Sequence, residues 1–166
     1  MNIIKRLFLC IALLLSLSGV VIKHIIDSTK MAVVYSPMPI ACVFLIVALI
    51  LLITYTFTKS NISKNIFLFA VLFLVIKECL WAGNTISVIF YITLIISRFK
   101  TIKQKTINIA IVVDSLVTSA LTIWFIIDNI NYYGSFYYAS PYIIGLLASL
   151  CANIEVWLIA FKPISK

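Results

Sequence analysis

Long apolar stretches separated by short polar connectors dominate this sequence. A helix needs about 20 apolar residues to cross a hydrocarbon core about 30 Å thick. Six stretches approach or reach that length, at residues 5–26, 40–57, 66–82, 85–97, 107–127 and 142–161. The pattern predicts an all-α fold, a polytopic transmembrane helical bundle, in which residues 1–166 form a single integral membrane domain.

The third and fourth stretches are short and admit two interpretations. They form either a hairpin of two thin spans that turns near Gly83 or one long tilted helix. The connectors on either side, at 58–65 and 98–105, both carry lysine or arginine. Positive charge favours the cytoplasmic face, and placing both connectors there requires an even number of crossings between them. Charge therefore favours the hairpin, six spans and cytoplasmic termini.

The first stretch also fits a secretory signal. It opens with Lys5 and Arg6, continues as an apolar run, and carries Ser16 and Ser18 in the small-x-small spacing of a cleavage site. Apolar character resumes directly after Lys23, whose long side chain can reach the far interface. We expect an uncleaved first span, with cleavage as the alternative.

The connector at 128–141 is rich in tyrosine and phenylalanine. It also contains Gly134 and Pro141, which interrupt helices. We expect a loop here, because aromatic rings favour the headgroup level of a membrane.

Composition supports a membrane protein. The chain is 64% hydrophobic and 11% charged, whereas soluble domains are about 25% charged. Of the 13 basic residues behind the net charge of +8, Lys23 and Lys30 fall outside, Lys77 falls within a span, and the others fall on the predicted cytoplasmic side. Topology therefore explains the charge better than nucleic acid does. Four cysteines without C-x-x-C spacing are interpreted as packing residues, and no metal or cofactor is expected.

The span at 107–127 carries a polar stripe. Asp114, Thr118 and Thr122 recur every four residues, and Ser115 and Ser119 lie one step round the helix. A carboxylate near the middle of a membrane helix costs about 2.5–3.5 kcal/mol. We therefore expect the stripe to face other helices.

A second acid, Glu155, lies at a matching depth in the last span. Both acids fall about 10 Å below the cytoplasmic boundary at a rise of about 1.5 Å per residue. The last span also has a small and polar face, with Gly145, Ser149 and Asn153 four residues apart. Opposed polar faces give a candidate pocket of five residues, namely Asp114, Glu155, Asn153, Thr118 and Ser149.

Two carboxylates so close together would share a proton or bind a cation, as a proton- or cation-coupled transporter requires. The alternative is structural. Each acid then pairs with Arg98, Lys100 or Lys162, which reach down from the interface, and the hydroxyl groups only pack helices.

Lys77 and Glu78 are secondary candidates. Adjacent helical residues point about 100° apart, so we expect each to have a separate partner. Trp81 follows Lys77 by one turn near the outer boundary, which favours an interface anchor over a substrate-binding charge.

Most catalytic machinery is excluded by residue type. The chain has one histidine, five acidic residues and no glycine-rich phosphate loop, so an enzyme is disfavoured. We expect a small protein of a bacterial inner membrane that transports or gates a small solute, proton or cation through a polar interior. The alternative is a membrane interaction module, such as an immunity protein against a pore-forming toxin or an accessory subunit. Such a module would capture a membrane protein partner or a second copy through lipid-facing residues such as Phe67, Phe69 and Phe73.

Overall fold

The computed structural model describes residues 2–29, 38–58, 63–81 and 84–161, and these residues form a helical bundle. Its six helices within those ranges are α1 (Asn2–Thr29), α2 (Met38–Phe57), α3 (Ser63–Leu80), α4 (Thr85–Phe99), α5 (Gln104–Tyr133) and α6 (Phe136–Ala160). Four of them, α1, α2, α5 and α6, are long and apolar enough to cross a membrane, while α4 is a shorter apolar helix. The predicted all-α bundle is confirmed.

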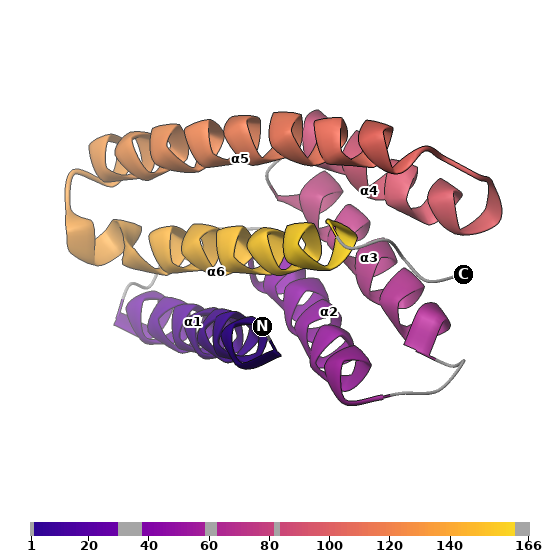
Figure 1. The fold of residues 1–166 in the computed structure, drawn as a ribbon. Coiled ribbons are helices and arrows are strands. Elements are labelled where there is room, and N and C mark those ends of the chain that lie inside the picture. Colours follow the sequence, from indigo (N-terminus) through magenta and orange to yellow (C-terminus); the bar gives the residue numbers. More distant parts are fainter. Residues whose placement is uncertain (1, 30–37, 59–62, 82–83, 162–166) are drawn as a thin grey trace.

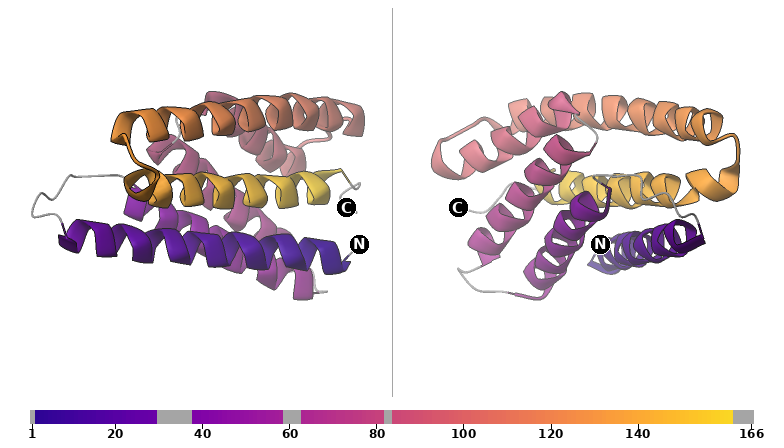
Figure 2. Two further views of the ribbon diagram at one scale, coloured as in Figure 1. Left: turned by 90° about the vertical axis from the view of Figure 1, so that its left-hand side faces the viewer. Right: turned by 180° about the vertical axis from the view of Figure 1, so that it is seen from behind.

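The helices form two layers. Helices α1, α6 and α5 lie side by side with α6 in the middle, as Figure 1 shows. Helices α2, α3 and α4 lie behind that layer and cross it obliquely (Figure 2). Because α6 contacts α1 on one side and α5 on the other, it is the most buried helix of the bundle.

The third and fourth stretches form separate helices that pack on each other, so the predicted hairpin is confirmed. Asn84 caps the start of α4. Gly83 of the expected turn lies outside the described residues, as do Lys30 and Lys162. The end of α2, the start of α3, the end of α4 and the start of α5 all lie towards the right of Figure 1. The two basic connectors therefore leave the bundle on the same side, as the predicted topology requires.

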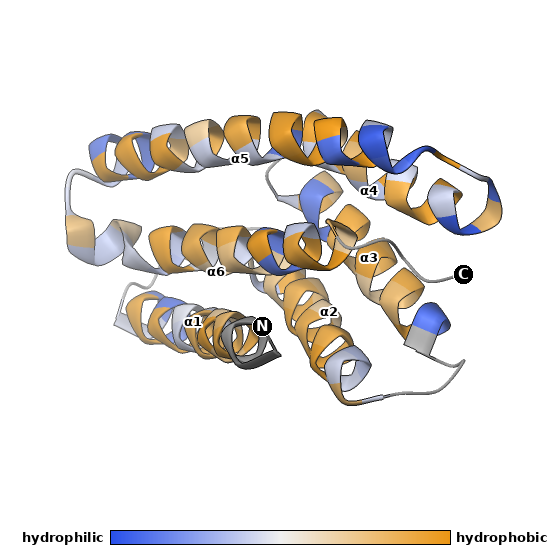
Figure 3. Cartoon of the chain, in the orientation of Figure 1, coloured by the Kyte–Doolittle hydropathy of each residue, from blue (hydrophilic) through white to orange (hydrophobic). Residues whose placement is uncertain are grey.

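The outside of the bundle is largely apolar. Hydrophobic colouring covers most of each helix in Figure 3, and large side chains such as Leu14 and Leu116 are more than half exposed. Four helices of this kind are compatible with an integral membrane protein. Phe69 is exposed as expected, but Phe67 is buried beneath the Arg98 guanidinium, 5.0 Å from its ring centroid, so its assignment to a lipid-facing surface was wrong.

Lys23 reaches towards the C-terminal end of α1 and pairs there with Asp27. Its side chain is buried, and its Nζ donates to Asp27 Oδ1 at 2.6 Å, one turn further along α1. The ammonium group also lies 6.0 Å from the ring centroid of Tyr142 on α6. The Asp27 carboxylate and the Tyr142 ring together take the place of water around the buried ammonium group.

The connector predicted at 128–141 is almost entirely helical, which corrects the expected loop. Helix α5 continues to Tyr133, and α6 begins at Phe136. Gly134 adopts a left-handed conformation at the end of α5, and the Ser135 hydroxyl accepts from the Tyr137 backbone N–H at the start of α6. Pro141 is tolerated because the Tyr137 carbonyl, which has lost its usual backbone donor, accepts the Ser140 hydroxyl at 2.7 Å.

Replacing Gly134 with alanine should destabilise the protein by about 1 kcal/mol, because a Cβ is disfavoured in the left-handed region. Its φ is 60°, and an added Cβ would meet nothing within 4 Å, so the cost comes from the backbone alone. Unfolding in mixed micelles, followed by circular dichroism, measures it. Gly134→Asn is the control, since asparagine tolerates this conformation and should recover most of the loss.

A buried polar network centred on Asp114

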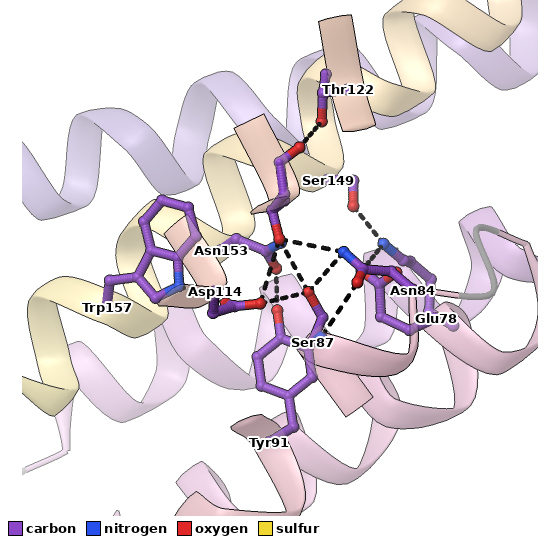
Figure 4. Close-up of polar contacts among 11 residues, drawn as sticks. Glu78, Asn84, Ser87, Tyr91, Asp114, Thr122, Ser149, Asn153 and Trp157 are labelled. Atoms are coloured by element: carbon purple, nitrogen blue, oxygen red, sulfur yellow. Dashed lines mark hydrogen bonds and ion pairs between the residues drawn. The ribbon is translucent and has the colours of Figure 1, made fainter. Parts of the chain in front are cut away.

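Asp114 is the centre of a buried polar network (Figure 4). Its side chain is 0% exposed, and both of its carboxylate oxygens accept hydrogen bonds. Ser87 Oγ donates to Oδ1 at 2.6 Å, and Thr118 Oγ1 donates to the same atom at 3.2 Å. Trp157 Nε1 donates to Oδ2 at 2.7 Å. Because these donors belong to α4, α5 and α6, Asp114 links three helices.

The start of α4 supports this arrangement. Asn84 is the N-cap residue, and its Oδ1 accepts from the backbone N–H of Ser87 at 3.3 Å, which satisfies one of the free amides of a helix start. Its Nδ2 donates to Ser87 Oγ at 2.9 Å and to Thr118 Oγ1 at 3.2 Å. The residue that begins α4 therefore also positions both hydroxyls that hold Asp114.

The polar stripe of α5 faces inward, as its spacing predicted. Asp114, Thr118 and Thr122 are all buried, and Thr122 Oγ1 donates to the Thr118 carbonyl at 2.7 Å. Ser115 and Ser119 are only half-buried, and the Ser115 hydroxyl bonds the Val112 carbonyl of its own helix at 2.8 Å. One row of the stripe thus joins the network and the other does not.

Helix α6 contributes three buried residues at intervals of four, Ser149, Asn153 and Trp157. The Tyr91 hydroxyl of α4 donates to Asn153 Oδ1. Asn153 Nδ2 is buried and has no acceptor in the part of the chain that the structure describes. Ser149 and Asn153 of the predicted pocket are therefore brought towards the Asp114 network from the facing helix.

Lys77 and Glu78 form a buried ion pair in the last turns of α3, 1% and 2% exposed. Lys77 Nζ bonds Glu78 Oε1 and also donates to Ser149 Oγ. The expectation of separate partners was wrong, because the flexible lysine side chain spans the angle of about 100° between adjacent positions. The expected role of Lys77 as an interface anchor is also corrected, since its ammonium group points into the bundle.

Glu155 is buried but does not join the network. Asn153 and Trp157 contact the network, and they lie two residues before and two residues after Glu155. A step of two residues is about 200° round a helix. Glu155 therefore projects from the opposite side of α6, and the expected pair with Asp114 was wrong. Among the described residues, Glu78 is an acid that lies near the network, since it lines the same cavity as Thr118, a donor to Asp114.

The structural alternative for Asp114 is corrected for two of its three expected partners, Arg98 and Lys100. Its hydrogen-bond partners are neutral donors rather than Arg98 or Lys100, within the described part of the chain. Arg98 lies over Phe67, and Lys100 is exposed at the end of α4. Lys162 lies outside the described residues. An acid solvated by hydroxyl and indole groups alone can gain or lose a proton without breaking an ion pair.

Sequence reasoning missed four members of the network: Asn84, Ser87, Tyr91 and Trp157. Ser87 and Tyr91 are polar residues four apart in an otherwise apolar segment, and this spacing was the available signal. Trp157 follows Asn153 by four and extends the polar face of α6.

A small cavity adjoins the network between α3, α4, α5 and α6. Its volume is about 20 Å³. Its polar lining residues are Glu78, Asn84, Thr118, Thr122 and Ser149, and Leu121, Phe125 and Leu146 complete the wall. Asp114 is separated from the cavity by Thr118, which lines the cavity and bonds the acid.

Neither a metal centre nor a known relative guides the interpretation further. Within the described residues, no three His, Cys, Asp or Glu side chains gather in a group that could hold a metal ion. Comparison of the chain with protein-family models, curated proteins and solved structures gives no match. The function must therefore be inferred from the network itself.

Proposed function

We propose that this protein is a non-enzymatic membrane protein of a bacterial inner membrane that transports or gates a small ion through its polar interior. The ion is a proton, and Asp114 is the residue that carries it. The observation behind this proposal is a fully buried carboxyl group whose donors in the described structure are all uncharged. An ionisable residue inside a membrane bundle marks an ion or proton pathway more often than a packing position.

The charge of the network supports a mobile proton. Its buried basic and acidic groups, among the described residues, are one ammonium, Lys77, and two carboxyls, Glu78 and Asp114. Burying net charge in a low dielectric is costly. The three groups together are neutral when the two acids share one proton. Since Lys77 is bonded to Glu78, the proton resides on Asp114 in the resting state.

The surroundings of Asp114 accommodate both of its protonation states. Hydroxyl groups can donate or accept, so Ser87 and Thr118 can donate to the carboxylate or accept from the carboxylic acid. These two hydroxyls lie 2.9 Å apart, and either can be the donor. Only the Trp157 indole is a fixed donor. A proton can therefore arrive and leave by reversal of hydrogen bonds, without movement of the helices.

Asp114→Asn tests the proposal. In proteoliposomes with a membrane potential, wild-type protein should change the internal pH, which a trapped indicator reports. In the variant the rate of this pH change should fall at least about tenfold, equivalent to about 1.4 kcal/mol of barrier. Trp157 fluorescence gives a second readout, because the charge of Asp114 lies 2.7 Å from its indole nitrogen. The emission of wild type should change with pH, and this component should be missing from the variant.

Asp128→Asn is the matched control, since it makes the same chemical change at an exposed position of α5. It should leave both the proton flux and the Trp157 response intact. Equal flux in wild type and Asp114→Asn would rule out Asp114 as the carrier. An absence of flux in wild type would reject transport and favour the interaction module.

A further inference from the structure

We infer that the cavity beside Glu78 holds a single water molecule that completes a proton relay between Glu78 and Asp114. This inference rests on the proposed function and extends it, because it assigns a second acid and a route. A cavity needs about 10–15 Å³ of accessible volume to hold one water. The volume of about 20 Å³ therefore suits one molecule and excludes a solute.

The cavity lining offers the hydrogen bonds that a buried water requires. Such a water has two to four polar partners. Ser149 Oγ accepts from Lys77, so its own O–H is available to donate. The described contacts of Glu78 engage Oε1, whereas a carboxylate has about four acceptor positions. Thr122 donates to the Thr118 carbonyl and retains lone pairs that can accept. A water in this position can thus accept from Ser149 and donate to Glu78 and to either Thr118 or Thr122.

The water joins two parts of the network that no hydrogen bond links within the described ranges. On one side is Glu78 with Lys77. On the other side is Thr118, which lines the cavity, bonds Asp114 Oδ1 and lies 2.9 Å from Ser87 Oγ. With the water present, hydrogen-bonding groups form a continuous chain from Glu78 through Thr118 to Asp114.

Proton transfer along this chain balances at each step. A proton on Glu78 passes to the water, the water passes one of its own to Thr118 Oγ1, and Thr118 passes its hydroxyl proton to Asp114 Oδ1. Each transfer breaks one O–H bond and forms another, and no atom changes oxidation state. The ammonium group of Lys77, which is bonded to Glu78, offsets the charge of one ionised acid, so the cluster is neutral before and after the transfer.

Two other ionisable groups lie near the chain among the described residues. Tyr91 on α4 donates its hydroxyl to Asn153 Oδ1, and Cys42 is buried on α2, near Lys77 rather than on the route to Asp114. Ser149, Asn153 and Trp157, the contacts of the network from α6, carry no charge. The relay thus has two proton-holding ends, Glu78 and Asp114.

Two substitutions at Thr122 distinguish the effect of losing the water from the effect of losing the Thr122 hydroxyl. Thr122→Val keeps the side-chain volume and leaves the cavity open, with Glu78, Thr118 and Ser149 still lining it. Thr122→Leu fills the cavity and displaces the water. We expect the valine variant to retain most of the proton flux and the leucine variant to lose at least about tenfold. Leu146→Phe fills the same cavity from α6 and should act like Thr122→Leu.

Infrared spectra provide a readout that does not depend on transport. The difference spectrum between low and high pH should contain a bound-water O–H stretch that shifts in H₂¹⁸O. This band should be present in wild type and Thr122→Val and missing from both filled variants. The Trp157 response to pH should persist in the filled variants, which shows that they are folded and that Asp114 still titrates.

The possible outcomes distinguish the relay from the proposed function. If the filled variants keep full flux and the Trp157 response, the water relay is overturned while Asp114 remains the carrier. If the water band is missing from wild type, the relay is likewise rejected. If wild type carries no proton flux, transport fails and the relay falls with it.

Discussion

Replacing Lys77 with methionine should destabilise the protein by about 3–5 kcal/mol, because removal of one partner of a buried ion pair leaves an uncompensated charge. Both members of this pair are at most 2% exposed, and Lys77 is also bonded to Ser149. Unfolding by added SDS in mixed micelles measures the loss.

The double variant Lys77→Met/Glu78→Met tests the cause of that loss. Buried pairs replaced by apolar residues of similar size often leave stability unchanged, so the second substitution should recover most of it. Asp27→Asn is the comparison, because the acid of that pair is 41% exposed, so water can replace part of the lost interaction and the cost should be smaller than for Lys77→Met. A stable single variant would contradict the buried pair.

The inward stripe of α5 was predictable because it depends on one helix. A spacing of four places Asp114, Thr118 and Thr122 on one side whatever the neighbouring helices are, and the cost of exposing a carboxylate to lipid decides which way that side faces. The six apolar stretches were predictable for a similar reason, since length and hydropathy are local properties of the sequence.

Glu155 shows why depth alone does not define a site. Counting residues from the end of a span gives the height of a side chain but not its direction round the helix. Asn153 and Glu155 differ by two residues and therefore face nearly opposite ways. Applying the same periodicity to the last span would have extended the face of Ser149 and Asn153 to Trp157 and excluded Glu155.

The roles of α3 and α4 could not be read from their sequences. Neither the pairing of Lys77 with its neighbour nor the cap formed by Asn84 follows from periodicity, because both depend on side-chain conformation and on the contacts of other helices. Likewise, the short turn between α5 and α6 depends on one left-handed residue, Gly134. Aromatic content alone suggested a longer loop.

The contact between Trp81 and Gly145 sets the register of α3 against α6. A Cβ at Gly145 would lie 2.2 Å from Cη2 of the Trp81 ring, so only glycine admits the indole. One turn away, Lys77 reaches Ser149. Residues 77 and 81 thus meet residues 149 and 145 in antiparallel order.

Gly145→Ala should therefore destabilise the protein by about 1–3 kcal/mol through overpacking, although alanine is about 1 kcal/mol better than glycine within a helix. In a Trp81→Leu background the clash is removed, and the same substitution should become stabilising by about 1 kcal/mol. The free energies of unfolding of wild type, Gly145→Ala, Trp81→Leu and the double variant give the coupling energy between the two residues directly.

Gly19→Ala is the matched control for that cycle, since its Cβ would meet neighbours at 3.3 Å rather than 2.2 Å and its effect should be small. Because the displaced indole lies one turn from Lys77, Gly145→Ala should also weaken the lysine contact with Ser149 and open the cavity that Ser149 lines. Proton flux in Gly145→Ala should then fall together with stability. If the indole of Trp81 holds Lys77 in place, the double variant Trp81→Leu/Gly145→Ala should lose flux but keep its stability. A destabilising effect of Gly145→Ala that persists without Trp81 would show that some other contact of α6 sets the register.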